Sequence, residues 1–576
     1  MKSIFVAVLS LAMVVLLTVP LMASAQTASD TLYVAATPPG NINNVIMGDT
    51  TATGQRKDPN RVYVLQQTGR VDSVYYFTQQ LETNFNVTII GKRNPVTGHL
   101  PVIAPFINTD NSSPIRFFFP TTGNFYFKNL YFIGTRPDGI AAVHNVVQTQ
   151  GNNERIVADS CVFDNFNNTY VFLFVGDSSS IYVTNCEFRN NEGPQWNGAG
   201  EFWQLKGLPM DTAVFVNNTF FCQSNQIIGA LGLVKYLLIN HNTMFMNDGQ
   251  VVEVPQAINA VIKNNIFYGT FAQGMDSLEI KGDKLTNGYQ GPSIVMTTPL
   301  STLANSPYNY TETERHVVVE NNAYYWPKPF YDNWTALNDT ASANGPGKIV
   351  TPTLFNPLTQ QMFSDNSSWP GFVAADNDSV DPGFNSTLVS TVADSLNGYV
   401  EAVWQYGTAG GDRFFYDAGN PATIFSQMPS SWTSYPVPED LSYINTSLQH
   451  AGTDGFALGD LNWFPSQKAA WVAAGGLQMG VKSLPNSVPA TFELSNNYPN
   501  PFNPSTNIKV SLKQNGVMSL KIYNVLGELV KVVDEGYKPA GEYVYNVNMD
   551  NYASGVYFYS LREGANGMTK KMMLLK

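Results

Sequence analysis

The amino-acid sequence predicts an all-β protein built from a parallel β-solenoid followed by a small β-sandwich. Three observations lead to this prediction. A short motif recurs between residues 125 and 325, Asn, Thr, Ser and Gln supply most of the polarity, and the character of the sequence changes after residue 490. Hydrophobic residues make up 44% of the 576 positions and charged residues only 13%. This apolar content is enough for a sizeable core and excludes disorder for most of the chain.

The N-terminus has the pattern of an export signal. Lys2 is followed by an apolar run from Ile4 to Val19, and Ala23-Ser24-Ala25 fits a cleavage site, so residues 1–25 are predicted to be a signal peptide. A membrane anchor is the alternative, but the run ends at Pro20 and is too short to span a bilayer. No transmembrane segment is expected in the mature chain, and residues 26–57 are assigned to an N-terminal extension.

The recurring motif has an apolar residue, Asn or Ser three positions later, and Phe or Tyr three positions after that. Three of the intervals between successive Asn or Ser positions are 23–25 residues. A repeat this short cannot bury its apolar face alone, so it must stack on its neighbours. The instances are Tyr126-Asn129-Phe132, Val157-Ser160-Phe163, Tyr182-Asn185-Phe188, Phe215-Asn218-Phe221, Ile239-Asn242-Phe245, Ile262-Asn265-Tyr268 and Val319-Asn322-Tyr325.

Stacking predicts columns of equivalent residues, because successive turns lie about 4.8 Å apart. We expect one Asn column at a bend, bonded to its neighbours and to the backbone, and one aromatic column buried inside. An antiparallel sandwich is the alternative, but it does not predict the same polar residue at the same offset in every segment. The same register stacks Cys161 on Cys186, with or without a disulfide, and pairs Asp164 with Arg189, which we interpret as a surface ion pair.

Several repeat segments resemble the rungs of a known protein family. The segments IYVTNCEFRNN, VFVNNTFFCQSN and IKNNIFYGT resemble rungs of right-handed parallel β-helix proteins of the pectate-lyase-like superfamily. NVTIIG (86–91) resembles a first rung after an N-terminal cap at 58–85, and GTDGFALGDLNWF (452–464) resembles a closing segment. The resemblance implies a β-helix over residues 58–481, with β-rich sequence to about residue 462. It implies no single activity, because this fold hosts lyases, hydrolases, adhesins and inert surface proteins.

The C-terminal region forms a separate module. After a linker at 482–490, residues 491–576 have alternating strands and Gly-containing turns that fit an Ig-like β-sandwich. YPNPFNP (498–504), IYN (522–524), SGVY (554–557) and the terminal KMMLLK resemble the type A C-terminal sorting domain of the type IX secretion system. The resemblance implies recognition by the translocon, processing by its sorting peptidase, and a secreted or surface-attached protein. A permanent Ig-like ligand-binding domain is the alternative.

Few residues suggest chemistry. The formal net charge of −12 gives no electrostatic case for binding nucleic acid. In the predicted register, the acids near the ladder fall in different columns, and the five histidines lack metal-ligand spacing. We therefore assign no residue a catalytic role, and we predict no metal or cofactor. The alternative is Ca²⁺ held by Asp376, Asp378 and Asp381.

The insertion at 189–214 contains the candidate ligand-binding residues Trp196, Glu201, Trp203 and Lys206. Exposed tryptophans beside polar groups suit sugar rings, although these aromatics would also serve to pin the insertion to the helix. The favoured interpretation is a surface protein that binds polysaccharide or has a structural or adhesive role, and we lean against an enzyme. The alternative is a polysaccharide lyase or glycoside hydrolase. Three converging acids, or acids and Arg on consecutive turns, would favour the enzyme. A groove lined with aromatics and amides but without a titratable cluster would favour binding, and a broad featureless face without a pocket would favour an adhesin.

Overall fold

The structure is a computed structural model, and its described part forms two compact units. One unit spans Thr27–Met479 and the other includes Gly480–Lys576, and each is treated by itself below. The described residues are 31–576 except 37–40, 54–55, 59, 67–73, 97, 137–141, 167–169, 192–200, 206–207, 224–226, 231, 255, 278–290, 301–309, 341–346, 407–438, 475, 477–491, 513–515, 539–540, 551 and 564–565. The predicted signal peptide lies outside this part.

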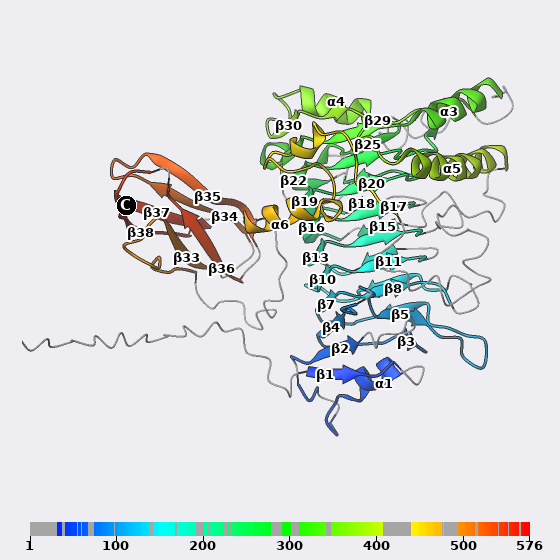
Figure 1. The fold of residues 1–576 in the computed structure, drawn as a ribbon, viewed down its shortest axis with the longest axis horizontal. Helices are drawn as coiled ribbons and strands as arrows, with labels where there is room; N and C mark the ends of the chain where they lie inside the picture. The colour runs from blue at the N-terminus through cyan, green and yellow to red at the C-terminus, as the bar shows by residue number, and fades with distance from the viewer. Residues whose placement is uncertain are drawn as a thin grey trace, which may run out of the picture. The chain divides into compact units, whose positions relative to one another are not determined.

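The first unit is a parallel β-helix whose rungs contribute strands to three long parallel sheets (Figure 1). The 11-stranded sheet contains β1 (Thr31–Val34), β2 (Val62–Gln66), β4 (Val87–Lys92), β7 (Phe125–Lys128), β10 (Arg155–Asp159), β13 (Ser179–Thr184), β16 (Met210–Val216), β19 (Val234–Asn240), β22 (Ala257–Lys263), β26 (His316–Glu320) and β30 (Phe372–Ala375). The 10-stranded sheet contains β3 (Val74–Phe77), β5 (Val102–Pro105), β8 (Tyr131–Ile133), β11 (Val162–Asp164), β14 (Glu187–Arg189), β17 (Thr219–Phe221), β20 (Thr243–Phe245), β23 (Ile266–Tyr268), β27 (Ala323–Tyr325) and β31 (Asp378–Ser379).

The third sheet has eight strands and carries none of the Asn motif. It contains β6 (Arg116–Phe118), β9 (Asn145–Gln148), β12 (Tyr170–Phe174), β15 (Glu201–Leu205), β18 (Ile228–Ala230), β21 (Val252–Glu253), β25 (Ser293–Met296) and β29 (Thr353–Phe355). The predicted insertion at 189–214 therefore includes a strand of the helix, because the motif marks only the first two strands of each rung. A short antiparallel pair, β24 (Met275–Asp276) and β28 (Ile349–Val350), stands apart from these sheets.

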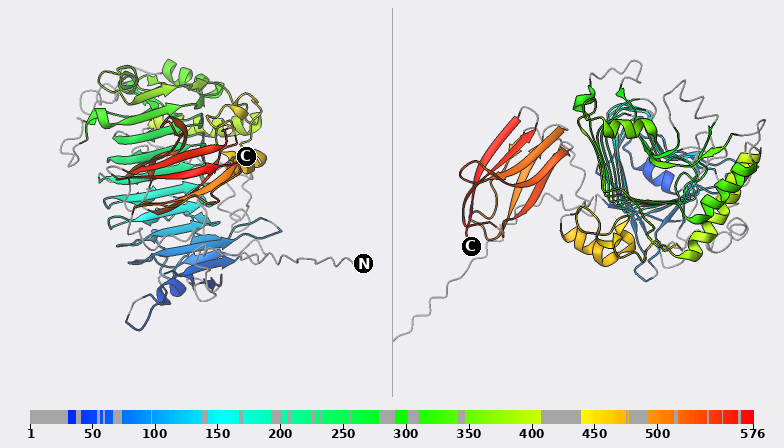
Figure 2. Two further views of the ribbon diagram at one scale, coloured as in Figure 1. Left: turned by 90° about the vertical axis from the view of Figure 1, so that its left-hand side faces the viewer. Right: turned by 90° about the horizontal axis from the view of Figure 1, so that it is seen from above.

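The interior is filled by side chains that alternate with outward-facing ones along each strand. In β13, Ile181 and Val183 are fully buried, and the rings of Phe163 and Phe188 stack on the next sheet with centroids 4.7 Å apart. Seen down the helix in Figure 2, α1 (Asn41–Gly48) lies across the interior and buries Ile42. Since β1 pairs with β2, the first rung lies inside the 26–57 segment that was assigned to an extension.

Helices cover the later part of this unit, where the sequence suggested continued β-structure. They are α3 (Lys328–Thr340), α4 (Pro357–Ser364), α5 (Ser386–Tyr406) and α6 (Pro465–Ala473). In α5, Leu388, Val392, Leu396 and Val400 recur every four residues and are buried, which is the spacing of one helical face.

The predicted Asn ladder is two adjacent columns, and the single-column register is wrong by one residue. The first column, here called the left-handed column, has φ between 50° and 57° and contains Asn129, Ser160, Asn185, Asn217, His241, Asn264, Asn321 and Asp376. The next column is a ladder that is buried except at its last member, here called the buried ladder. It contains Cys161, Cys186, Asn218, Asn242, Asn265, Asn322 and the half-buried Asn377. Asn suits both columns, because it tolerates a left-handed backbone and also bonds to its neighbours.

The same one-residue step divides the aromatic column. Phe188 stacks on Phe220 inside the helix, with centroids 5.1 Å apart, whereas Phe221 pairs with Arg189 and stacks on Phe245 at 5.4 Å. The last four predicted aromatics, from Phe221 to Tyr325, therefore form a separate stack on the outer face of the 10-stranded sheet. Phe384 packs edge-on against this outer stack.

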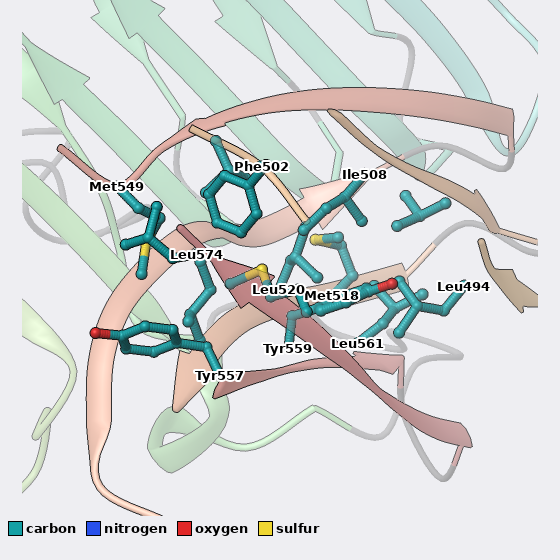
Figure 3. Close-up of a cluster of buried hydrophobic side chains, with 14 of the residues drawn as sticks. Leu494, Phe502, Ile508, Met518, Leu520, Met549, Tyr557, Tyr559, Leu561 and Leu574 are labelled. Atoms are coloured by element: carbon teal, nitrogen blue, oxygen red, sulfur yellow. The ribbon is translucent and has the colours of Figure 1, made fainter. Parts of the chain in front are cut away.

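The second unit is an antiparallel sandwich, as predicted. One sheet has the order β32-β33-β36 and the other β35-β34-β37-β38. Figure 3 shows the apolar core between them, which includes Phe502, Leu520 and Tyr559. The strands are β32 (Glu493–Leu494), β33 (Ser505–Leu512), β34 (Gly516–Tyr523), β35 (Leu529–Lys538), β36 (Gly541–Asn548), β37 (Gly555–Glu563) and β38 (Asn566–Leu574).

Candidate functional site

The outer face of the 10-stranded sheet is covered by residues 439–473, here called the return segment. It runs back along five consecutive rungs, and Figure 1 shows its last helix, α6, beside the middle strands. The left-handed column holds it: Asn321 Nδ2 donates to the Ala451 carbonyl, and Lys468 Nζ donates to Asn185 Oδ1. Between them, the N–H of Leu461 donates to Asn217 Oδ1 at 3.4 Å.

His241 also lies in the left-handed column, and its side chain has no exposed surface. Its Nδ1 lies 3.0 Å from the Ala457 carbonyl oxygen and its Nε2 lies 2.9 Å from Asp454 Oδ2. Trp471 Nε1 donates to the same Asp454 oxygen at 2.9 Å. Burial works to raise the pKa of Asp454, but its interactions with His241 outweigh burial and hold that pKa at about 2. This carboxylate therefore anchors the return segment in its ionised form.

A buried ion cluster lies at the start of the return segment. Arg189 of β14 donates from Nε and Nη2 to both oxygens of Glu439, at 2.7 and 3.0 Å, and from Nη1 to Asp164 Oδ2 at 2.9 Å. The Tyr131 hydroxyl donates to the same Asp164 oxygen at 2.5 Å. The predicted Asp164–Arg189 pairing is confirmed, but the interpretation as a surface ion pair is wrong, because each side chain is at most 8% exposed.

Glu187 adds a third carboxyl group to this cluster. It precedes Arg189 by two positions in β14 and therefore lies on the same face of the strand. Burial, followed by the neighbouring carboxylate of Glu439, raises the pKa of Glu187 well above its usual range. A protonated carboxyl beside an ionised one is an arrangement found in acid–base catalysts.

The cluster is nevertheless closed to a substrate in this conformation. All three nitrogens of the Arg189 guanidinium already donate hydrogen bonds to carboxylates, and the Glu439 side chain is 0% exposed. Sequence reasoning placed the acids in separate columns and missed Glu439, which lies 250 positions beyond Arg189. The only available signal was the resemblance of residues 452–464 to a closing segment, which hinted that the chain returns to the helix.

The candidate ligand-binding residues do not form a described site. Trp196 and Lys206 lie outside the described residues, and so does the side chain of Glu201 in β15. Trp203 is 0% exposed, and its ring centroid lies 5.5 Å from that of Phe215. Its ring therefore fills the helix interior and is not the exposed sugar platform that the sequence suggested.

The suggested calcium ligands and the cysteines are also located. Asp376 ends in the left-handed column and Asp378 in β31, and no group of three His, Cys, Asp or Glu among the described residues is arranged to hold a metal ion. Cys161 and Cys186 stack as predicted, with the N–H of Cys161 donating to Cys186 Sγ at 3.4 Å. Both are free thiols, and burial raises the pKa of Cys186 well above its usual value.

Comparison with known proteins decides the nature of the second unit. Residues 496–575 match the family described as the secretion system C-terminal sorting domain. This part of the chain is a sorting domain. It directs export through the type IX secretion system to the cell surface or the extracellular space. No curated protein and no solved structure matches the chain. Within the described residues, no helix combines the length and apolar character needed to cross a bilayer.

Proposed function

We propose that the chain is a surface-displayed polysaccharide-binding protein, and that part of the 11-stranded sheet is its binding surface. The observation that carries the proposal is an outward apolar column with polar columns on both sides. In this column Val214 is only 5% exposed, but Leu238, Val261 and Val318 are half-buried and Val373 is 47% exposed. We call the outer faces of β19, β22, β26 and β30 the open face.

The flanking columns of the open face supply hydrogen-bonding groups. One contains Tyr236, Asn259 and His316, and the other contains Asn240, Lys263 and Glu320. All six side chains are partly or fully exposed. Amide, hydroxyl and charged groups bind sugar hydroxyls, and the apolar column between them suits the C–H faces of sugar rings.

The repetition of the open face favours a polymer. Its rungs are about 4.8 Å apart, so similar side chains recur at equal steps along the helix axis. A polysaccharide lying along that axis meets similar contacts at successive steps, and several weak contacts on one chain add to the affinity. The flat outer face of a sheet also leaves both ends open to a long chain.

A polysaccharide lyase or glycoside hydrolase is the second candidate, favoured by the convergence of Asp164, Glu187 and Arg189 on consecutive turns. In such an enzyme the return segment would have to move away from the 10-stranded sheet before a substrate could reach Arg189, because Glu439 is bonded to the Arg189 guanidinium. Since the open face needs no such rearrangement, we favour binding.

The test uses the full chain and a panel of extracellular polysaccharides, with retention in affinity gels measured beside release of reducing or unsaturated ends. We expect retention without release, and we expect Val318→Asp to weaken it by about tenfold, as loss of one central contact does. Ile444→Asp, at a side chain that is 83% exposed in the return segment, is the matched control and should bind like the parent. Release of ends, or unchanged retention by Val318→Asp, would overturn the proposal.

A further inference from the structure

We propose that the outer face of the four-stranded sheet in the sorting domain is the surface that a protein of the secretion machinery recognises. We call this surface the sorting patch, and it consists of Tyr523, Val525, Leu526, Leu529, Val532 and Phe558. The proposal is independent of the ligand of the β-helix. It concerns which face of the sorting domain binds the secretion machinery during export.

The sorting patch is continuous across three strands. Tyr523 of β34 lies directly opposite Leu529 of β35 on one side and Phe558 of β37 on the other. Directly opposed residues in antiparallel strands have Cβ atoms about 4.5–5.5 Å apart, so their side chains touch. Lys571 of β38 stands opposite Phe558 and ends this cross-strand row.

The patch contributes nothing to the core of the domain. The neighbouring residues in the same strands, Ile522 and Tyr559, point the other way and are fully buried. By contrast, Leu529 is 51% exposed and Phe558 is 36% exposed. Contiguous exposed apolar surface on a small soluble domain marks an interaction site.

The turn between β34 and β35 presents the most exposed part of the patch on a fixed backbone. Asn524 Oδ1 accepts hydrogen bonds from the N–H groups of Leu526 and Glu528, at 2.9 and 3.0 Å. Gly527 has a φ of 81°, which completes the turn. Val525 and Leu526 are 64% and 79% exposed on this turn. Apolar side chains held on an ordered turn lose little conformational entropy on binding.

Charge indicates what kind of surface the patch fits. From residue 487 onward the chain has nine basic and seven acidic residues, or +2, so the preceding residues carry −12 − 2 = −14. Lys571 borders the patch directly, and it is exposed. The expected partner is therefore a protein of the export apparatus with an apolar centre and a carboxylate that meets Lys571. The sorting-domain match supplies the reason that such a partner must exist.

The test measures surface delivery of the full chain in its host. We expect Leu526→Asp and Phe558→Asp each to lower surface delivery by about tenfold, the effect of losing one apolar anchor, and to leave protein in the periplasm. Deletion of residues 487–576 sets the level of complete loss. The matched control is Thr569→Asp, which adds the same charge at an exposed position of β38 on the same outer face without removing an apolar side chain, and it should be delivered like the parent. Lys571→Glu should reduce delivery by reversing the rim charge.

A photocrosslinking amino acid at position 526 provides the second measurement. We expect an adduct with an outer-membrane protein of the export apparatus that Phe558→Asp abolishes. An adduct with residues 31–473 of the same chain, or with a second copy, would overturn the proposal, and so would parental delivery of both patch variants. If Phe558→Asp lowers the melting temperature, Leu526→Asp decides the matter, because its side chain lies on an exposed turn.

Discussion

Asn264 and Thr453 are 189 positions apart and bond to each other twice. Asn264 Nδ2 donates to Thr453 Oγ1 at 3.2 Å, and the N–H of Thr453 donates to Asn264 Oδ1 at 2.9 Å. Close by, the N–H of Gly459 donates to the Asn264 carbonyl oxygen at 2.8 Å, and a Cβ at Gly459 would lie 2.5 Å from Thr243 Oγ1. One asparagine therefore serves both as a left-handed residue of its rung and as an anchor for the return segment.

Replacing Asn264 with Gly separates these two roles. Gly keeps the left-handed backbone, so the variant loses only the side-chain contacts. We expect the free energy of unfolding to fall by about 1–3 kcal/mol, the value of two or three hydrogen bonds, in a denaturant titration. Asn129→Gly is the matched control, because Asn129 has a φ of 53° but lies below the rungs that the return segment contacts. Equal loss in both variants would show that the backbone conformation, and not the anchor, is what matters.

The interior stack predicts a large effect at Phe188. This ring is fully buried, and its centroid lies 4.7 Å from that of Phe163, 4.1 Å from Phe202 and 5.1 Å from Phe220. Phe188→Ala should lower the free energy of unfolding by about 3–5 kcal/mol, the usual cost of removing a core Phe. Thermal melting measures this, and a melting temperature within one or two degrees of the parent would contradict the interior register.

Asp248 predicts a pH dependence. It is fully buried, its Oδ1 has no hydrogen-bond partner among the described residues, and burial raises its pKa to about 8. Between pH 5 and 8 the folded chain keeps a proton that the unfolded chain has lost, so the free energy of unfolding falls as pH rises. Over these three pH units the loss is up to about 4 kcal/mol.

Asp248→Asn should remove most of this loss, so its stabilisation should be larger at pH 8 than at pH 5 in thermal melts. Asp365→Asn is the control. Hydrogen bonds from Ser367 and Ser368 lower the pKa of Asp365 to about 2, so this group is ionised at both pH values. A difference between variant and parent that is the same at pH 5 and pH 8 would argue against a protonated Asp248.

The stacked thiols predict a labelling pattern. Cys161, Cys186 and Cys222 are all buried and free. We expect the folded chain to react with no thiol reagent at pH 8 and the denatured chain to take up three equivalents, as measured by intact mass. Uptake of a single equivalent after denaturation, restored to three by a reductant, would mean that two of them are bonded in the exported protein.

The sequence predicted the class of both units because their signals are local and repeated. The rung spacing, the buried stack at Phe132 and Phe163, and the stacking of Cys161 on Cys186 all follow from one short motif. The one-residue step between Asn185 and Asn218 could not be seen, since Asn satisfies the left-handed column and the buried ladder equally well.

The contacts of the return segment with the outer face of the 10-stranded sheet could not be predicted from the sequence for a different reason. Glu439 and Asp454 meet Arg189 and His241 only through the path of the return segment, and no local pattern encodes a contact over more than 200 positions. Trp203 was misplaced because the third strand of each rung has no motif of its own, so the residues of β15 were interpreted as part of an insertion.

The return segment also changes how this solenoid can unfold. In an unbraced repeat protein each turn depends only on its neighbours, so the ends fray and partly folded arrays are populated. Here a single length of chain is anchored on five successive turns, from Asn185 to Asn321. Opening any of these turns strains or breaks anchors on the others. This stretch should therefore lose its structure in one cooperative step. The turns at Asn129 and Ser160 are coupled to it, because Tyr131 and Asp164 bond to each other and Asp164 bonds to Arg189. The turns before them can open independently, so the brace protects the later part of the helix outside the cell.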